Sequence, residues 1–318
     1  GAACPPRTAM RGWVIRVTDR GAHSAVRPVD RRSFFRLSTG AAVGTAAVAA
    51  TAAGVPAPAD PSAPASAAPA SPARQFRGMW LSSVENIDWP SRSGLTAQAQ
   101  QEEYLAWLDL AQEMGLNAVI AQVRPTADAF WPSPYEPWSA YLTGVQGKDP
   151  GYDPLAFQIE AAHERNLEYH AWFNPYRVAM SEDPELVEDH PARRRPEWVW
   201  PYGGKLYYDP GVPEVRAFVL DAMMDAVSRY DVDGAHFDDY FYPYPSGDLD
   251  YPDQATFARY GDGATSIEDW RRENIDLLVR EMRERIRAEK PWVRFGISPF
   301  GIWRNASSDP AGSDTSGS

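Results

Sequence analysis

The hydrophobic and polar positions between residues 77 and 298 follow two different periods. Short, continuous apolar runs are typical of buried strands, and we expect such strands at residues 77–84, 117–123, 167–173, 233–240 and 294–298. Between these runs, apolar residues recur every three to four positions, which predicts amphipathic helices at residues 98–114, 153–165, 212–230 and 266–290. Strands and helices therefore alternate along this region.

Such alternation predicts βαβ units, whose buried strands form a parallel sheet with right-handed connections. The connections that follow the strands are long, whereas those that lead from a helix into the next strand are short. This asymmetry favours an α/β fold of the (β/α)8 TIM-barrel type, because such barrels carry their functional loops at the carboxyl ends of the strands. Since five strands are expected, we predict a barrel that is truncated after about five βα units.

The sequence before this region has a different composition. Residues 30–37 read Asp-Arg-Arg-Ser-Phe-Phe-Arg-Leu, and a weakly apolar run rich in Ala and Gly continues to residue 55. Paired arginines before such a run are typical of a twin-arginine signal peptide. The alternative is a chance Arg pair before low-complexity sequence. The run is too poor in Leu and Ile to predict a permanent membrane span.

We therefore expect four segments in this chain. They are an upstream extension at residues 1–29, a twin-arginine signal peptide at 30–55, a Pro/Ala/Ser linker at 56–73 and a partial barrel domain at 74–318. This organisation predicts export by the twin-arginine route, with the mature protein outside the cell or associated with the cell wall.

Composition and motif spacing argue against several other classes of protein. The formal net charge of −12, without a basic stripe, argues against a nucleic-acid partner. A single cysteine, Cys4, excludes a disulfide framework. The histidines lack the spacing of metal ligands, and no Gly-rich phosphate loop is present. We therefore expect neither a metal nor another cofactor.

The densest chemistry lies at the end of the fourth expected strand. Residues 232–243 read Val-Asp-Gly-Ala-His-Phe-Asp-Asp-Tyr-Phe-Tyr-Pro. Because an unpaired carboxylate is costly to desolvate, two adjacent carboxylates at the end of a buried strand indicate a site. Strand alternation would place His236, Asp238 and Tyr240 on one face and Asp239 on the other.

Six ordered motifs extend this picture along the chain. They are Arg-Gly-Met-Trp-Leu at 77–81, Gln-Val-Arg-Pro at 122–125, Trp-Phe-Asn-Pro-Tyr-Arg at 172–177, Tyr-Asp-Pro-Gly at 208–211, the segment 233–243 and Ile-Ser-Pro-Phe-Gly at 297–301. Over residues 74–305 the chain thereby resembles the glycosyl-hydrolase-like-10 family. The resemblance implies a TIM-barrel glycoside hydrolase of the bacterial envelope. At least one member acts on peptidoglycan strands that lack stem peptides, and members usually continue beyond the present endpoint.

Glycoside hydrolysis typically uses two carboxyl groups, one protonated and one ionised. We predict that Asp238 and Asp239 are catalytic, with Asp238 in the barrel lumen. Asp239 is expected at the rim, where it would accept sugar hydroxyls or hold a loop cation. Two carboxylates held close together would also push their pKa values apart. The alternative is that an Asp pairs with Arg124 or Arg177 only to satisfy the barrel mouth.

Polar residues after the second and third strands are predicted to bind substrate, together with three others. The full set is Arg124, Asp128, Asn174, Tyr176, Arg177, His236, Tyr240 and Trp303. An Arg at such a strand end suits a carboxylate, for example the lactyl group of muramic acid. The alternative for the arginines is an internal salt bridge with Asp128 or Asp238.

Four tryptophans on the expected loops either stack on sugars or fill the interior. They are Trp131, Trp138, Trp200 and Trp303. Taken together, the sequence predicts an exported glycoside hydrolase that cleaves O-glycosidic bonds in an envelope polysaccharide, with peptidoglycan glycan strands as the expected substrate. The alternative is a non-catalytic, glycan-binding barrel.

Overall fold

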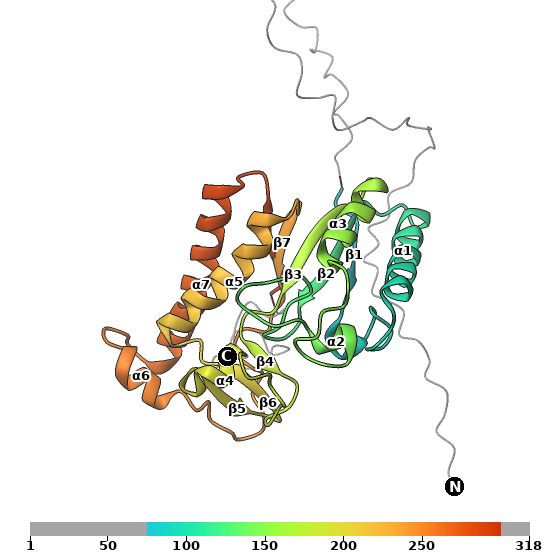
Figure 1. The fold of residues 1–318 in the computed structure, drawn as a ribbon. Coiled ribbons are helices and arrows are strands. Elements are labelled where there is room, and N and C mark those ends of the chain that lie inside the picture. The colour runs from blue at the N-terminus through green and yellow to red at the C-terminus, as the bar shows by residue number, and fades with distance from the viewer. Residues whose placement is uncertain (1–74, 300–318) are drawn as a thin grey trace, which may run out of the picture. The chain divides into compact units, whose positions relative to one another are not determined.

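The computed structural model describes residues 75–299, and five parallel strands form its main sheet (Figure 1). In spatial order they are β1 (Gly78–Leu81), β2 (Ala118–Arg124), β3 (Glu168–Phe173), β7 (Gly234–Phe237) and β8 (Arg294–Ile297). Neighbours in space are thus successive parallel strands of the chain, as in a barrel, rather than strands whose order reverses as in a doubly wound sheet. The expected α/β fold class is confirmed. Within the described residues the sheet is open, because β1 and β8 each pair with one strand.

Four long helices connect these strands, with bounds close to those predicted. They are α1 (Ala97–Glu113), α3 (Pro154–Glu164), α5 (Pro213–Arg229) and α7 (Ile267–Glu289). The side chains of Thr96, Asp153 and Ser266 accept hydrogen bonds from the first turns of α1, α3 and α7. Shorter elements are η2 (Val84–Asn86), α2 (Ala140–Thr143), α4 (Pro191–Arg194), η3 (Pro196–Trp198) and α6 (Gln254–Tyr260).

The two faces of the parallel sheet carry different side chains. Alternate residues such as Val119, Ala171 and Phe237 belong to the same buried core cluster as Leu108 of α1 and Val219 of α5. Because successive side chains of a strand point to opposite faces, the residues between them face away from the helices. In this article we call that second face the lumen face.

A second, antiparallel sheet occupies the segment that was expected to be a long loop. It consists of β4 (Arg177–Ala179), β6 (Lys205–Tyr208) and β5 (Val199–Tyr202). The hairpin between β5 and β6 turns at Gly203 and Gly204, which both have positive φ angles, as a two-residue hairpin requires. Figure 1 shows this sheet and α2 at one end of the long helices; α2 follows β2 and β4 follows β3, so both lie beyond carboxyl ends of parallel strands.

The fourth parallel strand is shorter than predicted. β7 ends at Phe237 rather than at Tyr240, and the next residues form a turn. The Asp238 carboxylate accepts a hydrogen bond from the backbone N–H of Tyr240 (3.0 Å), which stabilises the turn instead of a further strand pairing. Strand alternation therefore does not extend to Asp239 and Tyr240.

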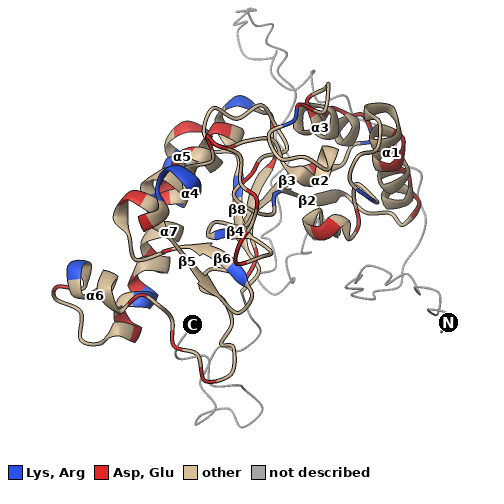
Figure 2. Cartoon of the chain, turned by 60° about the horizontal axis from the view of Figure 1, so that its bottom comes forward, with Lys and Arg blue, Asp and Glu red and all other residues tan. Residues whose placement is uncertain are grey.

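Charged residues in the described part of the chain are dispersed along the helices and loops. Figure 2 shows acidic and basic positions interleaved on α5 and α7. Within residues 75–299, none of the helices combines the length and the apolar character that a membrane span requires. The expected signal peptide, the linker and Trp303 lie outside the described residues.

Candidate active site

Asp238 lies directly beyond the carboxyl end of β7 and is 5% exposed. Its Oδ2 atom accepts hydrogen bonds from Asn174 Nδ2 (2.5 Å) and from Trp172 Nε1 (3.1 Å). Its Oδ1 atom accepts the hydrogen bond from the Tyr240 N–H. Donors from β3, from the loop after β3 and from the turn that begins at Asp238 itself therefore hold this carboxyl group in a single orientation.

Burial dominates the ionisation of Asp238. Desolvation raises the pKa of its carboxyl group above the ordinary value, and the negative charge of Asp239 acts in the same direction. The hydrogen bonds from Tyr240 and Asn174 and the positive charge of Arg177 oppose this effect, because they stabilise the ionised form. The carboxyl group thus keeps its proton to higher pH than a solvent-exposed aspartate does.

Asn174 and Arg177 belong to the immediate surroundings of Asp238. Asn174 Oδ1 accepts from Arg177 Nη2 (3.1 Å), while Arg177 Nε donates to the Pro125 carbonyl (2.9 Å). The Arg177 guanidinium also lies over the Tyr240 ring, 5.4 Å from its centroid. Arg177 is buried, so its contacts are with protein groups and not with an open surface. The alternative of an internal salt bridge is not found for Arg177, because none of the ion pairs among residues 75–299 includes it. Near Asp238 its guanidinium donates to the Asn174 amide oxygen instead.

Asp239 faces a different environment from its neighbour. It is half-buried, and its Oδ2 atom accepts a hydrogen bond from the Tyr244 hydroxyl. The ring of Tyr244 lies 5.0 Å from that of Tyr240, centroid to centroid. Asp239 is therefore more accessible than Asp238 and lies beside the Tyr244 hydroxyl, and its contact with sugar hydroxyls stays a prediction.

His236 lies one step deeper than Asp238 on the lumen face. Its ring is 5.2 Å from that of Trp80, and Trp80 is 5.5 Å from Trp172. Burial lowers the pKa of His236 to about 4, with His170 contributing in the same direction, so the imidazole is neutral at pH 7. Its Nε2 atom has no hydrogen-bond partner within residues 75–299. The contact of His236 with substrate stays a prediction, and so does the placement of Tyr240 on the same face, because β7 ends at Phe237.

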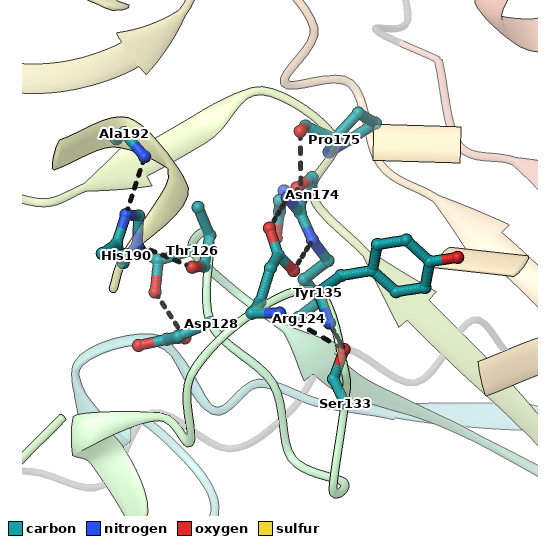
Figure 3. Close-up of polar contacts among 11 residues, drawn as sticks. Arg124, Thr126, Asp128, Ser133, Tyr135, Asn174, Pro175, His190 and Ala192 are labelled. Carbon is teal, nitrogen blue, oxygen red and sulfur yellow. Dashed lines mark hydrogen bonds and ion pairs between the residues drawn. The ribbon is translucent and has the colours of Figure 1, made fainter. Parts of the chain in front are cut away.

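Arg124 does not face a ligand. Its guanidinium forms a two-point ion pair with Glu136 (2.5 and 2.7 Å), and both side chains are 0% exposed. It also donates to the carbonyls of Asn174 and Pro175 (Figure 3). The alternative of an internal salt bridge is therefore correct, but the partner is Glu136 and not Asp128 or Asp238. With all these donors engaged, Arg124 supports the backbone at Asn174 and corrects the expectation that it binds a carboxylate of the substrate.

Asp128 and Tyr176 are also inaccessible. Asp128 is 3% exposed and accepts a hydrogen bond from Thr126 Oγ1 (2.8 Å; Figure 3). Tyr176 is 0% exposed and belongs to the hydrophobic core cluster. In this conformation neither side chain has enough exposed surface to contact a glycan. This corrects the expectation that they bind substrate.

The tryptophans of the expected loops were predicted either to stack on sugars or to fill the interior, and they differ in exposure. Trp131 is 0% exposed and its Nε1 donates to Asp225 (2.8 Å). Trp200 lies in β5, 6% exposed, with its ring 5.7 Å from that of Tyr207. Both fill the interior instead of forming stacking platforms. Trp138 is half-buried, and it lines, together with an edge of Trp131, a cavity of about 820 Å³ beside the loop at residues 131–138.

Sequence reasoning missed three residues of this region: Gln122, Trp172 and Glu136. Gln122 Nε2 donates to Asn174 Oδ1 (2.6 Å), and Trp172 contacts Asp238 directly. Gln122 was visible in the sequence as a polar residue inside an otherwise apolar strand, which is a position that demands a partner. Glu136 gave no such signal, because it lies in an irregular loop.

The described residues contain no group of three or more His, Cys, Asp or Glu side chains arranged to hold a metal ion. The cavity beside residues 131–138 is not lined by Asp238 or Asp239. The site itself consists of an oriented, buried carboxyl group next to a half-buried carboxylate, at the carboxyl end of a parallel strand.

Comparison with known proteins points in the same direction. The model of the "Glycosyl hydrolase-like 10" family matches residues 75–317. Glycosyl hydrolase YngK from Bacillus subtilis (strain 168) is 57% identical over 245 residues, which are 76% of this chain and 48% of YngK. Glycosyl hydrolase DigH from Escherichia coli (strain K12) is 40% identical over 262 residues, which are 77% of this chain and 60% of DigH.

The chain thus spans about half of YngK and less than two thirds of DigH. Among solved structures, α-L-fucosidase isoenzyme 2 from Paenibacillus thiaminolyticus is similar with a TM-score of 0.49 and 17% identity, over 74% of this chain and 34% of that one.

Proposed function

The chain belongs to the glycosyl hydrolase-like 10 family, and on that premise we propose that it is an exported glycoside hydrolase that cleaves O-glycosidic bonds in an envelope polysaccharide. The observation that carries the proposal is the carboxyl group of Asp238, buried and held by three hydrogen bonds at the end of β7. Donors from Trp172, Asn174 and the Tyr240 backbone orient this carboxyl group, and burial keeps its pKa raised.

We further propose peptidoglycan glycan strands as the substrate. This choice is supported by the resemblance of the chain to envelope glycosidases. The names of its relatives, which are both called glycosyl hydrolases, support glycoside hydrolysis and name no substrate. Recognition of a lactyl carboxylate by Arg124 or Arg177 no longer supports it, because both guanidinium groups are engaged with protein atoms. Export is supported by the paired Arg31 and Arg32 before the apolar run.

The test compares the full-length wild-type protein with Asp238→Asn on peptidoglycan strands freed of stem peptides. We expect turnover, measured as new reducing ends, to fall by roughly 10²–10⁴-fold, which is the usual contribution of a positioned acid–base group. Binding to the insoluble strands, measured by co-sedimentation, should change little. Asp248→Asn, which removes an exposed carboxylate, is the matched control.

Two outcomes would redirect the assignment. A loss of activity smaller than about tenfold would move the catalytic role to Asp239 or to residues outside those described. Binding without any turnover by the wild-type protein would favour the non-catalytic, glycan-binding barrel.

A further inference from the structure

The side-chain amide of Gln122 connects the end of β1 with Asn174. Gln122 lies on β2 and is 3% exposed. Its Oε1 atom accepts hydrogen bonds from the Ser82 hydroxyl and from the backbone N–H groups of Ser83 and Val84, each at 2.9 Å. Its Nε2 atom donates to Asn174 Oδ1 (2.6 Å). The amide therefore lies between two fixed partners.

The direction of every hydrogen bond in this chain of contacts is determined. Backbone N–H groups only donate, so the Gln122 oxygen must face Ser83 and Val84, and its NH2 group must face Asn174. The Arg177 guanidinium also only donates, and it contacts the same Asn174 oxygen. Asn174 therefore has to turn its own NH2 group toward Asp238 Oδ2, where it lies at 2.5 Å.

We propose that Gln122 is a positioning residue, which fixes the orientation of the Asn174 amide so that Asn174 donates to Oδ2 of Asp238. The proposal rests on the proposed function to the extent that it treats Asp238 as the catalytic carboxyl group. Oδ2 then receives two donors, from Asn174 and Trp172, whereas Oδ1 receives one, from the Tyr240 N–H. Because Oδ1 has fewer donors than Oδ2, it is the oxygen that either carries the transferable proton or attacks the substrate.

Two substitutions separate the parts of this contact. In Gln122→Glu, an oxygen still accepts from Ser83 and Val84, but the group that faces Asn174 no longer donates when the glutamate is ionised. Gln122→Met keeps the approximate volume and removes both functions. In either variant Asn174 Oδ1 keeps only the donor from Arg177, so the Asn174 amide is held less firmly toward Asp238. The ionised form of Asp238 then loses support and its pKa rises.

We expect three changes in these variants of the full-length protein. The limb of the pH profile of kcat/KM that reports Asp238 should move upward by about one unit, since loss of a hydrogen bond to the charged form is worth about that much. This is the acid limb if Asp238 reacts as the carboxylate and the basic limb if it donates its proton. The value of kcat should fall about tenfold, while KM changes by less than about threefold, because binding groups are untouched. Melting temperature reports any loss of stability separately.

Gln158→Met is the matched control. Gln158 is buried like Gln122, with 1% of its surface exposed, and its side chain accepts a hydrogen bond from the Tyr169 hydroxyl. It lies on α3, away from Asp238. It should lower the melting temperature without moving the pH profile. A purely structural role of Gln122 would produce that same result.

A second readout does not depend on turnover. In protein labelled with ¹⁵N-tryptophan, the Trp172 indole N–H donates to Asp238, so its signal should titrate with that carboxyl group. Trp172→Phe assigns the signal. The midpoint should move upward in Gln122→Glu and Gln122→Met and stay in place in Gln158→Met; an unmoved midpoint in both Gln122 variants would overturn the proposal.

The two proposals fail in different ways. If Asp238→Asn retains turnover, the catalytic assignment is wrong, and the Trp172 titration still decides whether Gln122 orients Asn174. If Asp238→Asn is inactive but both Gln122 variants keep the wild-type pH profile and midpoint, the catalytic assignment stands and the role of Gln122 is refuted.

Discussion

Asp128 offers a quantitative test of how burial controls ionisation near the site. Its carboxyl group is 3% exposed, and desolvation raises its pKa from 3.8 to about 6, although the hydrogen bond from Thr126 opposes the shift. The negative charge of Glu136 also raises the pKa. In the unfolded chain this carboxyl group has its ordinary value. The free energy of unfolding is therefore lower at pH values at which Asp128 has to be ionised in the folded protein.

The sign and the size of the effect follow from the two pKa values. Below about pH 4, Asp128 is protonated in both states and contributes no pH dependence. Between about pH 4 and 6 the native state binds more protons than the unfolded state, so stability falls as pH rises. A shift of about two units corresponds to about 3 kcal/mol, which is lost in full above about pH 7.

Asp128→Asn removes the ionisation while its side-chain oxygen can still accept from Thr126. We expect this variant to unfold at higher urea concentration than wild type at pH 8, with a gain of about 3 kcal/mol in the free energy of unfolding, and to resemble wild type near pH 4. Urea titrations followed by tryptophan fluorescence at several pH values measure both. Asp248→Asn, at an exposed position, should show no such pH-dependent gain. Parallel pH curves for wild type and Asp128→Asn would refute the reasoning.

Two further predictions concern other parts of the chain. Glu136→Gln should lower the free energy of unfolding by about 3–5 kcal/mol, because it leaves the fully buried Arg124 guanidinium without its counter-ion; an unchanged urea midpoint would show that the pair is not a stabilising contact. Replacement of Arg31 and Arg32 by Lys should block export through the twin-arginine route, measured as accumulation of precursor inside the cell, and undiminished secretion would remove the signal-peptide assignment.

The periodicity of apolar residues was sufficient to predict the parallel sheet and its four long helices. This worked because buried strands such as β2 read as continuous apolar runs, whereas α5 and α7 repeat their apolar residues at helical spacing. The small sheet was missed, although Gly203-Gly204 between aromatic residues is a hairpin signal. Its strands are short, and Trp and Tyr are equally common in glycan-binding loops, so composition favoured the wrong interpretation.

The candidate site was harder to predict, because position along a strand end does not reveal which way a side chain turns. Asp238 follows β7, whereas Asn174 and Arg177 both follow β3, and the three residues do meet. Arg124 at the end of β2 and Tyr176 after β3 also lie near strand ends, but they are buried on other contacts. The partner of Arg124 lies in an irregular loop, and no periodic pattern connects the two residues.

Asp238 and Asp239 show why adjacent carboxylates can have separate roles. Asp238 is enclosed by donors from β3 and from its own turn, and burial raises its pKa. Asp239 is half-buried at the rim and accepts from a tyrosine hydroxyl. If the two groups act as an acid–base pair, as proposed above, the end of a short strand supplies the different environments that such a pair needs without any distance in sequence. The ending of β7 at Phe237 places Asp238 in the turn whose Tyr240 N–H holds its carboxyl group.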